Sequence, residues 1–254
     1  MKSLLMFIYS IIAYLIGFVS LLLLIIFVSG LVPQISIDGT PETGAFPAIL
    51  KNMGLVLLFA IQHSVMARKS FKNWISSFMP KPIERSTYVL VTGVLLTFII
   101  FQWEPLGGMI WAVDPGTPLY YALYALFFIG WGILFVSTFL INHFDLFGLR
   151  QTFMELQGKP YTPLKFKVFS LYKYVRHPLY LGGIIGLWAT PVMSATHLVC
   201  AIGMGAYFVI GAFFEEKDLI DDFGQDYLDY KAKTSMIIPL PKTGKKIMEK
   251  VEVS

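Results

Sequence analysis

The sequence predicts an all-α, polytopic membrane protein whose single domain occupies residues 1–254. Of its residues, 56% are hydrophobic and only 14% are charged, whereas soluble domains carry roughly 25% charged residues. Long apolar runs recur along the chain, and most are close to the roughly 17–25 residues that cross a bilayer as a helix. These observations predict a helical membrane bundle with about six transmembrane helices.

Four of the apolar runs lie in the N-terminal part of the chain. They cover about residues 4–28, 47–66, 87–103 and 118–141. The first run lacks a small-residue cleavage pattern, so we interpret it as a retained anchor and not as a signal peptide. We expect residues 1–141 to form a membrane region of four helices. The long connection over residues 142–177 is then a candidate functional loop or lid.

The last two spans form an apolar hairpin within residues 178–240. Pro178 suits the first turn of a helix, where its missing N–H would have no partner in any case. This first run extends to about Met193, and Pro191 contributes to a predicted turn. The second run covers residues 197–214 and leads back. Two antiparallel helices of matched length would return the chain to the membrane face from which it departed.

Two clusters of ionisable groups meet at the open end of this hairpin. Arg176 and His177 precede its first helix, where unpaired N–H groups favour an anionic ligand group. Glu215 and Glu216 follow the second run, and carboxylates at a helix C-terminus oppose the helix dipole unless a cation or hydrogen-bond donor compensates. A ligand with a carboxylate and with amine or hydroxyl donors fits both clusters, and S-adenosylmethionine is such a ligand.

The basic residues predict the orientation in the membrane. If the N-terminus is inside, Lys51 is the one residue among twenty lysines and arginines that lies outside. Cytoplasmic loops carry such an excess of basic residues. We therefore expect both termini and both clusters to be cytoplasmic. This topology also explains the net charge of +4, which gives no case for a nucleic-acid partner.

Two histidines are expected near the cytoplasmic face. His63, beside Gln62, lies inside the second span, where an ionisable residue is a functional hypothesis because it is costly in lipid. The alternative is a histidine that merely bonds a backbone carbonyl or Gln62. His143 follows the fourth span. If the two converge, they form a polar catalytic cavity or, alternatively, ligate a haem in a redox protein.

The remaining segments predict surface helices. Residues 67–86 alternate basic and aromatic side chains, which is typical of a helix that lies among lipid headgroups. Residues 219–230 predict a cytoplasmic amphipathic helix folded against the membrane. We expect the polar tail, 241–254, to be disordered or surface-bound. The single cysteine, Cys200, excludes an intramolecular disulfide and a CxxC metal site, and we expect no metal.

Several motifs resemble a known group of membrane enzymes. They are LFAIQHSVMAR (58–68), ERSTYVL (84–90), INHFDLFGLRQ (141–151) and VRHPLYLGGIIGLWATP (175–191), followed by FEE and FGQDYLDYK. The C-terminal half resembles the isoprenylcysteine carboxyl methyltransferase and phospholipid methyltransferase superfamily, and nearly the whole chain resembles the bacterial methanethiol S-methyltransferases. NnrU-type membrane proteins share the general pattern. No GxGxxG motif follows a strand, so a soluble Rossmann-type methyltransferase is excluded.

The resemblance implies S-adenosylmethionine-dependent methylation of a small thiol, methanethiol to dimethyl sulfide, in a bacterial inner membrane. The cofactor-binding residues that it implies are Gln151, Tyr172, Arg176, His177, Pro178, Tyr180, Glu215 and Glu216. A thiol must lose its proton to react, so His63 is the expected base and His143 the second candidate. Gln62 and His63 would contact the thiol.

Other activities stay open at this point. The isoprenylcysteine enzymes keep a basic residue about one turn before the glutamate pair, where this chain has Gly211 and Ala212. The absence of this basic residue favours a small apolar methyl acceptor. The alternatives are another thiol, an isoprenylcysteine carboxylate, a lipid amine, and a NnrU-like or haem-binding membrane protein without methyltransferase activity. Membrane lipid is an expected partner, and the oligomeric state is not predicted.

Overall fold

The computed structural model describes residues 1–240, so the expectation for residues 241–254 lies outside the described residues. Five helices in this part of the chain are long and apolar enough to cross a membrane. They are α1 (Lys2–Ser29), α2 (Ala45–Ala67), α4 (Glu84–Gln102), α5 (Pro118–Ile141) and α9 (Ala195–Phe223). The shorter elements are α3 (Lys69–Ile75), η1 (Lys81–Ile83), β1 (Met109–Ala112), α6 (His143–Leu146), α7 (Leu149–Leu156), η2 (Ser170–Lys173), α8 (Pro178–Trp188), β2 (Val192–Ser194) and α10 (Gln225–Lys233).

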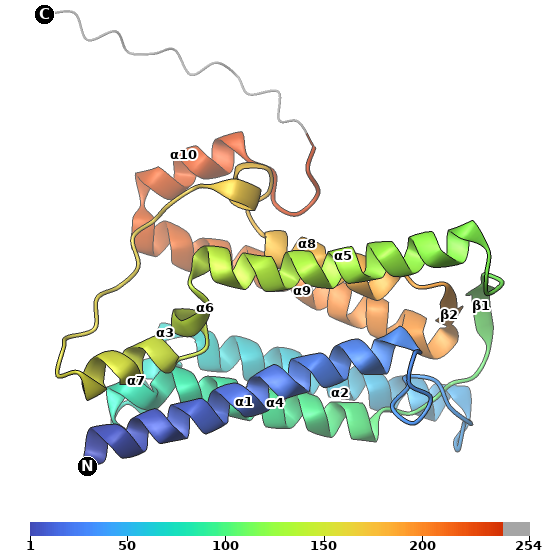
Figure 1. Ribbon diagram of the computed structural model, residues 1–254, viewed down its shortest axis with the longest axis horizontal. Helices are drawn as coiled ribbons and strands as arrows, with labels where there is room; N and C mark the ends of the chain where they lie inside the picture. Colours follow the sequence, from blue (N-terminus) through green and yellow to red (C-terminus); the bar gives the residue numbers. More distant parts are fainter. Residues whose placement is uncertain (241–254) are drawn as a thin grey trace, which may run out of the picture.

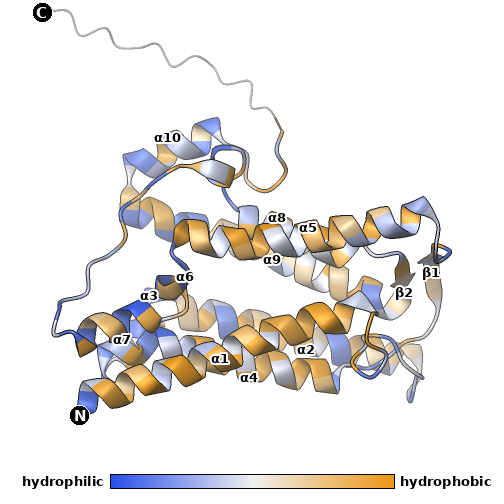
Figure 2. Ribbon diagram, in the orientation of Figure 1, coloured by the Kyte–Doolittle hydropathy of each residue, from blue (hydrophilic) through white to orange (hydrophobic). Residues whose placement is uncertain are grey.

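The long helices run side by side in two layers. Figure 1 shows α1, α2 and α4 in one layer, and α5, α8 and α9 in the other. We call the end that carries the N-terminus, α3, α7 and α10 the basic end, and the end that carries β1 and β2 the strand end. The hydrophilic residues gather on α3, α7 and α10 in Figure 2, whereas α1 and α5 are mostly apolar. The predicted all-α polytopic membrane bundle is confirmed.

The outer surfaces of the spans are themselves apolar. Only 22–33% of the most apolar 18-residue window of each span is buried within the protein. The rest of each window is exposed or half-buried, and the exposed side chains of the spans include Leu57, Phe101 and Phe139. In water such a surface would aggregate, whereas in a bilayer it meets lipid tails. The protein is therefore an integral membrane protein.

Glycines allow pairs of these helices to approach closely. A Cβ atom built on Gly182 of α8 would lie 2.5 Å from the carbonyl oxygen of Gly130 in α5. A Cβ on Gly93 of α4 would lie 2.8 Å from Cα of Gly17 in α1. Small residues at membrane helix contacts increase van der Waals packing, which replaces the hydrophobic effect that is missing between helices in lipid. The α5–α8 and α1–α4 pairs are the tightest in the bundle for this reason.

The first arm of the hairpin is shorter than predicted. Helix α8 ends at Trp188 because Ala189 leaves the helical region and Pro191 disfavours helix at the residue before it. At about 1.5 Å per residue, its 11 residues span only about 16 Å. The chain still reaches the strand end, because β2 pairs there with β1 in an antiparallel register that includes Met109 and Ser194. It therefore passes between the two ends six times, five times as a long helix.

The second arm is longer than predicted. Helix α9 continues through Glu215 and Glu216 to Phe223, so these acids lie inside the helix and not at its C-terminus. Gly224, with φ 55°, then breaks the helix and turns the chain into α10. The amphipathic helix predicted over residues 219–230 is thus divided between α9 and α10. The helix expected within residues 67–86 is likewise limited to α3. Trp74, on this helix, and Phe78, which follows it, are both exposed.

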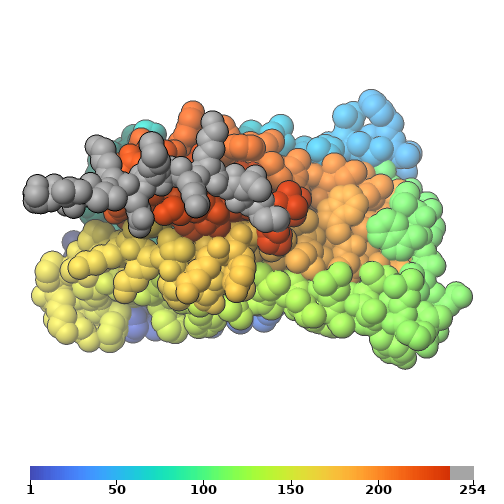
Figure 3. Space-filling model, turned by 90° about the horizontal axis from the view of Figure 1, so that it is seen from above, coloured from blue at the N-terminus to red at the C-terminus, as the bar shows by residue number. Residues whose placement is uncertain are grey.

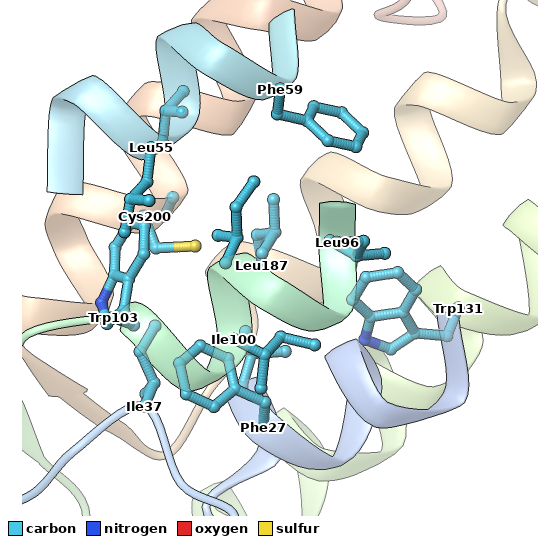
Figure 4. Close-up of a cluster of buried hydrophobic side chains, with 14 of the residues drawn as sticks. Phe27, Ile37, Leu55, Phe59, Leu96, Ile100, Trp103, Trp131, Leu187 and Cys200 are labelled. Carbon is cyan, nitrogen blue, oxygen red and sulfur yellow. The ribbon is translucent and has the colours of Figure 1, made fainter. Parts of the chain in front are cut away.

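An apolar core fills the space between the two layers. It includes Phe27 of α1, Phe59 of α2, Leu96 of α4, Trp131 of α5 and Cys200 of α9. Figure 4 shows these side chains converging from the different helices, with Phe59 at one edge of the group. Cys200 is buried among them as a thiol, as a small apolar side chain would be.

Lys51, at the strand end, has an acidic partner. Lys51 Nζ lies 2.9 Å from Glu104 Oε2. This hydrogen bond with Lys51 lowers the pKa of the Glu104 carboxyl. Asn52, fully buried, bonds both the backbone N–H and the carbonyl of Glu104. These contacts join the start of α2 to the end of α4.

Candidate functional site

Arg176 lies in the extended residues just before α8 and is almost completely buried. Its Nε lies 2.6 Å from Glu216 Oε1 of α9. Its Nη1 donates to the carbonyl oxygens of Lys231, at 3.2 Å, and of Thr234. The guanidinium therefore ties three segments together: the entry to α8, the end of α9 and the end of α10.

Backbone bonds reinforce this arrangement. The backbone N–H of Arg176 donates to the carbonyl oxygen of Ser235 at 2.8 Å, and that of His177 donates to the carbonyl oxygen of Met236 at 3.0 Å. The Tyr230 hydroxyl of α10 donates to the carbonyl of Tyr172 at 2.6 Å. In Figure 3 the segment before α8, in yellow and gold, lies beside the α9–α10 region, in orange and red. The turn at Gly224 thus brings α10 back to hold the chain that starts α8.

The two adjacent glutamates have different surroundings. Glu216 is 2% exposed, and its carboxylate meets Arg176, His177 and the Lys231 ammonium, at 2.6, 3.3 and 2.7 Å. Its charge is compensated within the protein. The Glu215 side chain is 46% exposed and accepts a 2.8 Å hydrogen bond from the Tyr180 hydroxyl. Glu215 is therefore the carboxylate that a ligand can reach.

His177 connects the two glutamates. Its Nδ1 lies 3.5 Å from Glu215 Oε2, and its Nε2 lies 3.3 Å from Glu216 Oε1. Burial alone would lower the pKa of His177, but the hydrogen bonds with Glu215 and Glu216 outweigh burial and raise that pKa. The two ionisable clusters predicted at the open end of the hairpin therefore do meet.

The other predicted cofactor-binding residues fall into two groups. Pro178 is the first residue of α8, and Tyr180 stacks on His177 with ring centroids 5.3 Å apart. Burial, and after it the charge of Glu215, raise the pKa of Tyr172, so this tyrosine belongs to the same neighbourhood. Gln151 lies on α7, which Figure 1 shows beside the start of α1, whereas α8 lies in the other layer. Its amide donates to the Asp145 carbonyl.

His63 lies in a polar pair between α2 and α4. Its Nε2 and the Tyr88 hydroxyl are hydrogen-bonded at 2.5 Å, while its Nδ1 lies 3.5 Å from the Thr92 hydroxyl. The ring stacks on Phe59 at 5.3 Å. Gln62 donates to Thr92 at 3.3 Å, and its carbonyl oxygen is buried without a partner. One nitrogen of His63 is thus firmly held, and the other has only a long contact.

His143 is held more completely. Its Nδ1 lies 2.8 Å from the Thr138 hydroxyl and its Nε2 lies 3.0 Å from the Tyr14 hydroxyl. It stacks on Phe139 at 4.2 Å, and burial lowers its pKa. Within residues 1–240, no side chain bonds or stacks with both His63 and His143. The convergence that a shared catalytic cavity or a shared haem requires is not seen in these contacts.

An aromatic line connects the glutamates to His63. We use this name for His177, Tyr180, Phe208, Tyr207 and His63. Successive ring centroids are 5.3, 5.5, 6.0 and 6.1 Å apart. Because Tyr207 and Phe208 are neighbours on α9, this one helix links the two groups of polar residues.

Two cavities lie near these residues. One is enclosed by apolar side chains that include Phe59, Cys200 and Met204, and its volume is about 20 Å³, enough for little more than one water molecule. The other is an open groove of about 360 Å³ along α10, lined by both acidic and basic side chains such as Lys173 and Asp229. The apolar cavity adjoins His63 through Phe59.

The sequence did not identify Tyr88 and Tyr207 as members of this site. Tyr88 belongs to the ERSTYVL motif and lies inside a span. A polar side chain at such a depth needs a hydrogen-bond partner, and that rule could have singled it out. Tyr207 had no comparable signal, because an aromatic residue within an apolar run is ordinarily a core residue.

Known proteins resemble the chain closely. Methanethiol S-methyltransferase 1 of Bradyrhizobium diazoefficiens is 50% identical over 234 residues, which are 92% of this chain and 81% of the relative. The methanethiol S-methyltransferase of Mycobacterium tuberculosis is 43% identical over 242 residues, 95% of this chain and 98% of the relative. The chain belongs to the methanethiol S-methyltransferase family. The resemblance inferred from the motifs is thereby confirmed.

The chain is also similar, at lower identity, to proteins with another name. Nurim of Sus scrofa is 27% identical over 175 residues, 66% of each chain. No protein-family model and no solved structure matches the chain. The family assignment therefore rests on the sequences of the methanethiol S-methyltransferases, and the arrangement of the site comes from the present structure.

Proposed function

We propose that this protein transfers the methyl group of S-adenosylmethionine to methanethiol and forms dimethyl sulfide. The observation that carries the proposal is the 43–50% identity to proteins named methanethiol S-methyltransferase over most of the chain. The geometry supports it, since a reachable carboxylate at Glu215 and a histidine inside a span lie at the two ends of the aromatic line. No finding favours an isoprenylcysteine, a lipid amine or a haem-binding role.

The residues at the basic end fit this cofactor. Glu215 would accept hydrogen bonds from the amino group of S-adenosylmethionine. The unpaired N–H groups of the first turn of α8 would favour the carboxylate of the cofactor. Tyr172 and Tyr180 would provide hydroxyl and ring contacts. Glu216 and Arg176 would hold the frame on which these groups stand, because their charges already compensate each other. When bound, the cofactor supplies an electrophilic methyl group that a thiolate sulfur can take, leaving a neutral thioether.

His63 would remove the proton from the thiol. A thiolate is the reactive form, and a neutral imidazole nitrogen can accept its proton near neutral pH. Nε2 is hydrogen-bonded to Tyr88, so Nδ1, with only a 3.5 Å contact to Thr92, is the nitrogen that would receive the proton. The apolar walls beside Phe59 suit a small, uncharged acceptor that arrives from the lipid.

The protein would work in a bacterial cytoplasmic membrane, with the basic end in the cytoplasm. The positions of Lys69, Arg85 and Arg150 on that end support this orientation, because cytoplasmic loops carry an excess of basic residues. S-adenosylmethionine is then supplied from the side on which Glu215 is exposed. A reporter fused after residue 240 and one inserted near residue 40 should report opposite sides of the membrane.

The test of the proposed activity is a direct assay. Membranes containing the protein would be supplied with methanethiol and S-adenosylmethionine, and the headspace would be analysed for dimethyl sulfide. We expect dimethyl sulfide in equal amount to S-adenosylhomocysteine, and little turnover of an isoprenylated cysteine. Membranes that carry the Glu215→Gln variant are the control. Robust turnover of the prenylcysteine with none of methanethiol would contradict the proposal.

A further inference from the structure

Tyr207 occupies a special position on α9. Its ring lies 6.1 Å from the ring of His63 and 5.6 Å from that of Phe59, and it crosses both nearly at right angles. It also contacts Phe208, whose ring centroid is 6.0 Å away. The ring thus links the histidine in the span with the part of the aromatic line that leads to the glutamates.

The face of α9 between Tyr207 and Glu215 carries a glycine. Residues 207, 211 and 215 are four apart and share one face of the helix, and residue 211 is a glycine. A Cβ atom built there would have as its nearest neighbour the Tyr180 hydroxyl, 3.9 Å away. Tyr207 and Glu215 are about 12 Å apart along the helix axis. Between an aromatic ring and a reachable carboxylate, α9 itself therefore contributes no side chain at residue 211, and the nearest group there is the Tyr180 hydroxyl of α8.

We propose that the ring of Tyr207 binds the sulfonium cation of the methyl donor through a cation–π contact. This proposal rests on the proposed function. With its amino group at Glu215, the cofactor would extend over Gly211 and bring its positively charged sulfur towards Tyr207. The face of a tyrosine ring attracts cations within about 6 Å, and the low dielectric of a membrane site strengthens the attraction. His63, whose ring centroid lies 6.1 Å from that of Tyr207, would then deprotonate the thiol close to the methyl group that its sulfur attacks.

The charge of the sulfur provides the test, because S-adenosylmethionine is a sulfonium cation and S-adenosylhomocysteine is a neutral thioether. Binding of both compounds to the purified full-length protein would be measured by calorimetry. We expect Tyr207→Leu to weaken the binding of S-adenosylmethionine more than that of S-adenosylhomocysteine. The affinity for S-adenosylmethionine relative to that for S-adenosylhomocysteine should fall roughly 5- to 30-fold. Tyr207→Phe keeps the ring and should keep the ratio.

Phe128→Leu is the matched control, because this ring is 53% exposed on α5 and lies outside the site; it should leave both affinities unchanged. Binding of S-adenosylhomocysteine also reports that each variant is folded. An unchanged ratio in Tyr207→Leu, with or without an equal loss for both compounds, would mean that the ring only packs and would overturn the proposal. Wild-type protein that binds neither compound would overturn the cofactor assignment itself.

Discussion

Arg176 and Glu216 form a buried ion pair in which Nε and Oε1 are 2.6 Å apart and the side chains are 5% and 3% exposed. The side chain of the neighbouring Glu215 is half-exposed instead. Two consecutive residues of one helix therefore differ in what they can do. Glu216 holds the frame of the site, whereas Glu215 is available to a ligand.

The two glutamates should respond differently to loss of charge. Glu216→Gln leaves the Arg176 guanidinium buried without its carboxylate, and breaking a buried pair in this way typically costs about 3–5 kcal/mol. We expect this variant to lower the unfolding temperature in detergent strongly. Glu215→Gln should unfold like the wild type but lose affinity for S-adenosylmethionine in calorimetry. A stable Glu216→Gln protein would contradict the structural role of the pair.

His177 should make stability depend on pH. Its pKa is raised in the folded protein above the ordinary value of 6.5, so the folded state takes up the proton more readily than the unfolded state. The stabilisation is therefore complete below about pH 6.5 and is lost as the pH rises through the raised value. We expect the difference in unfolding temperature between wild type and His177→Asn to be largest in mild acid and to shrink towards alkaline pH.

His143 should show the opposite dependence. Burial lowers its pKa, so its contribution is present above about pH 6.5 and is lost as the pH falls through the lowered value. The difference in unfolding temperature between wild type and His143→Asn should therefore shrink in acid. If both histidine variants followed the same trend, the opposite environments inferred for the two rings would be wrong.

The contact between α5 and α8 should not tolerate added volume. In Gly182→Ala the new Cβ would meet backbone atoms, the Gly130 oxygen at 2.5 Å and the Leu134 nitrogen at 2.6 Å. Overpacking of this kind costs about 1–3 kcal/mol. Gly132→Ala, on the partner helix α5 and with no atom within 4 Å of its Cβ, is the control and should be neutral or stabilising by up to about 1 kcal/mol. Equal stabilities would argue against the close contact.

His63→Ala should lose methyl transfer most strongly near neutral pH. Removal of a general base typically costs about 10²–10⁴-fold in rate. Part of the loss should return at higher pH, because thiol pKa values lie above neutrality and the thiolate then forms without help. Tyr88→Phe should reduce the rate less, since it removes only the group that orients the ring. A wild-type rate in His63→Ala at neutral pH would exclude this histidine from the reaction.

Local properties of the sequence determined the membrane architecture. The run at 118–141 became α5 with the same bounds, because a long apolar segment between polar turns can satisfy its backbone only as a helix in lipid. The same holds for α1, α2 and α4, within a few residues. Pro178 marked the start of α8 correctly for the equally local reason that its ring is suited to a first helical turn.

Tertiary contacts decided where α9 ends and which polar groups meet. Two adjacent acids suggested the end of a helix, but α9 continues because Arg176 and Lys231, 40 and 15 residues away from Glu216 in the sequence, neutralise that carboxylate. His63 likewise found its partner in Tyr88, on another helix. Apolar periodicity is a property of neighbouring residues, whereas the compensation of a buried charge depends on which distant segments fold against it. That compensation appears only in the folded structure.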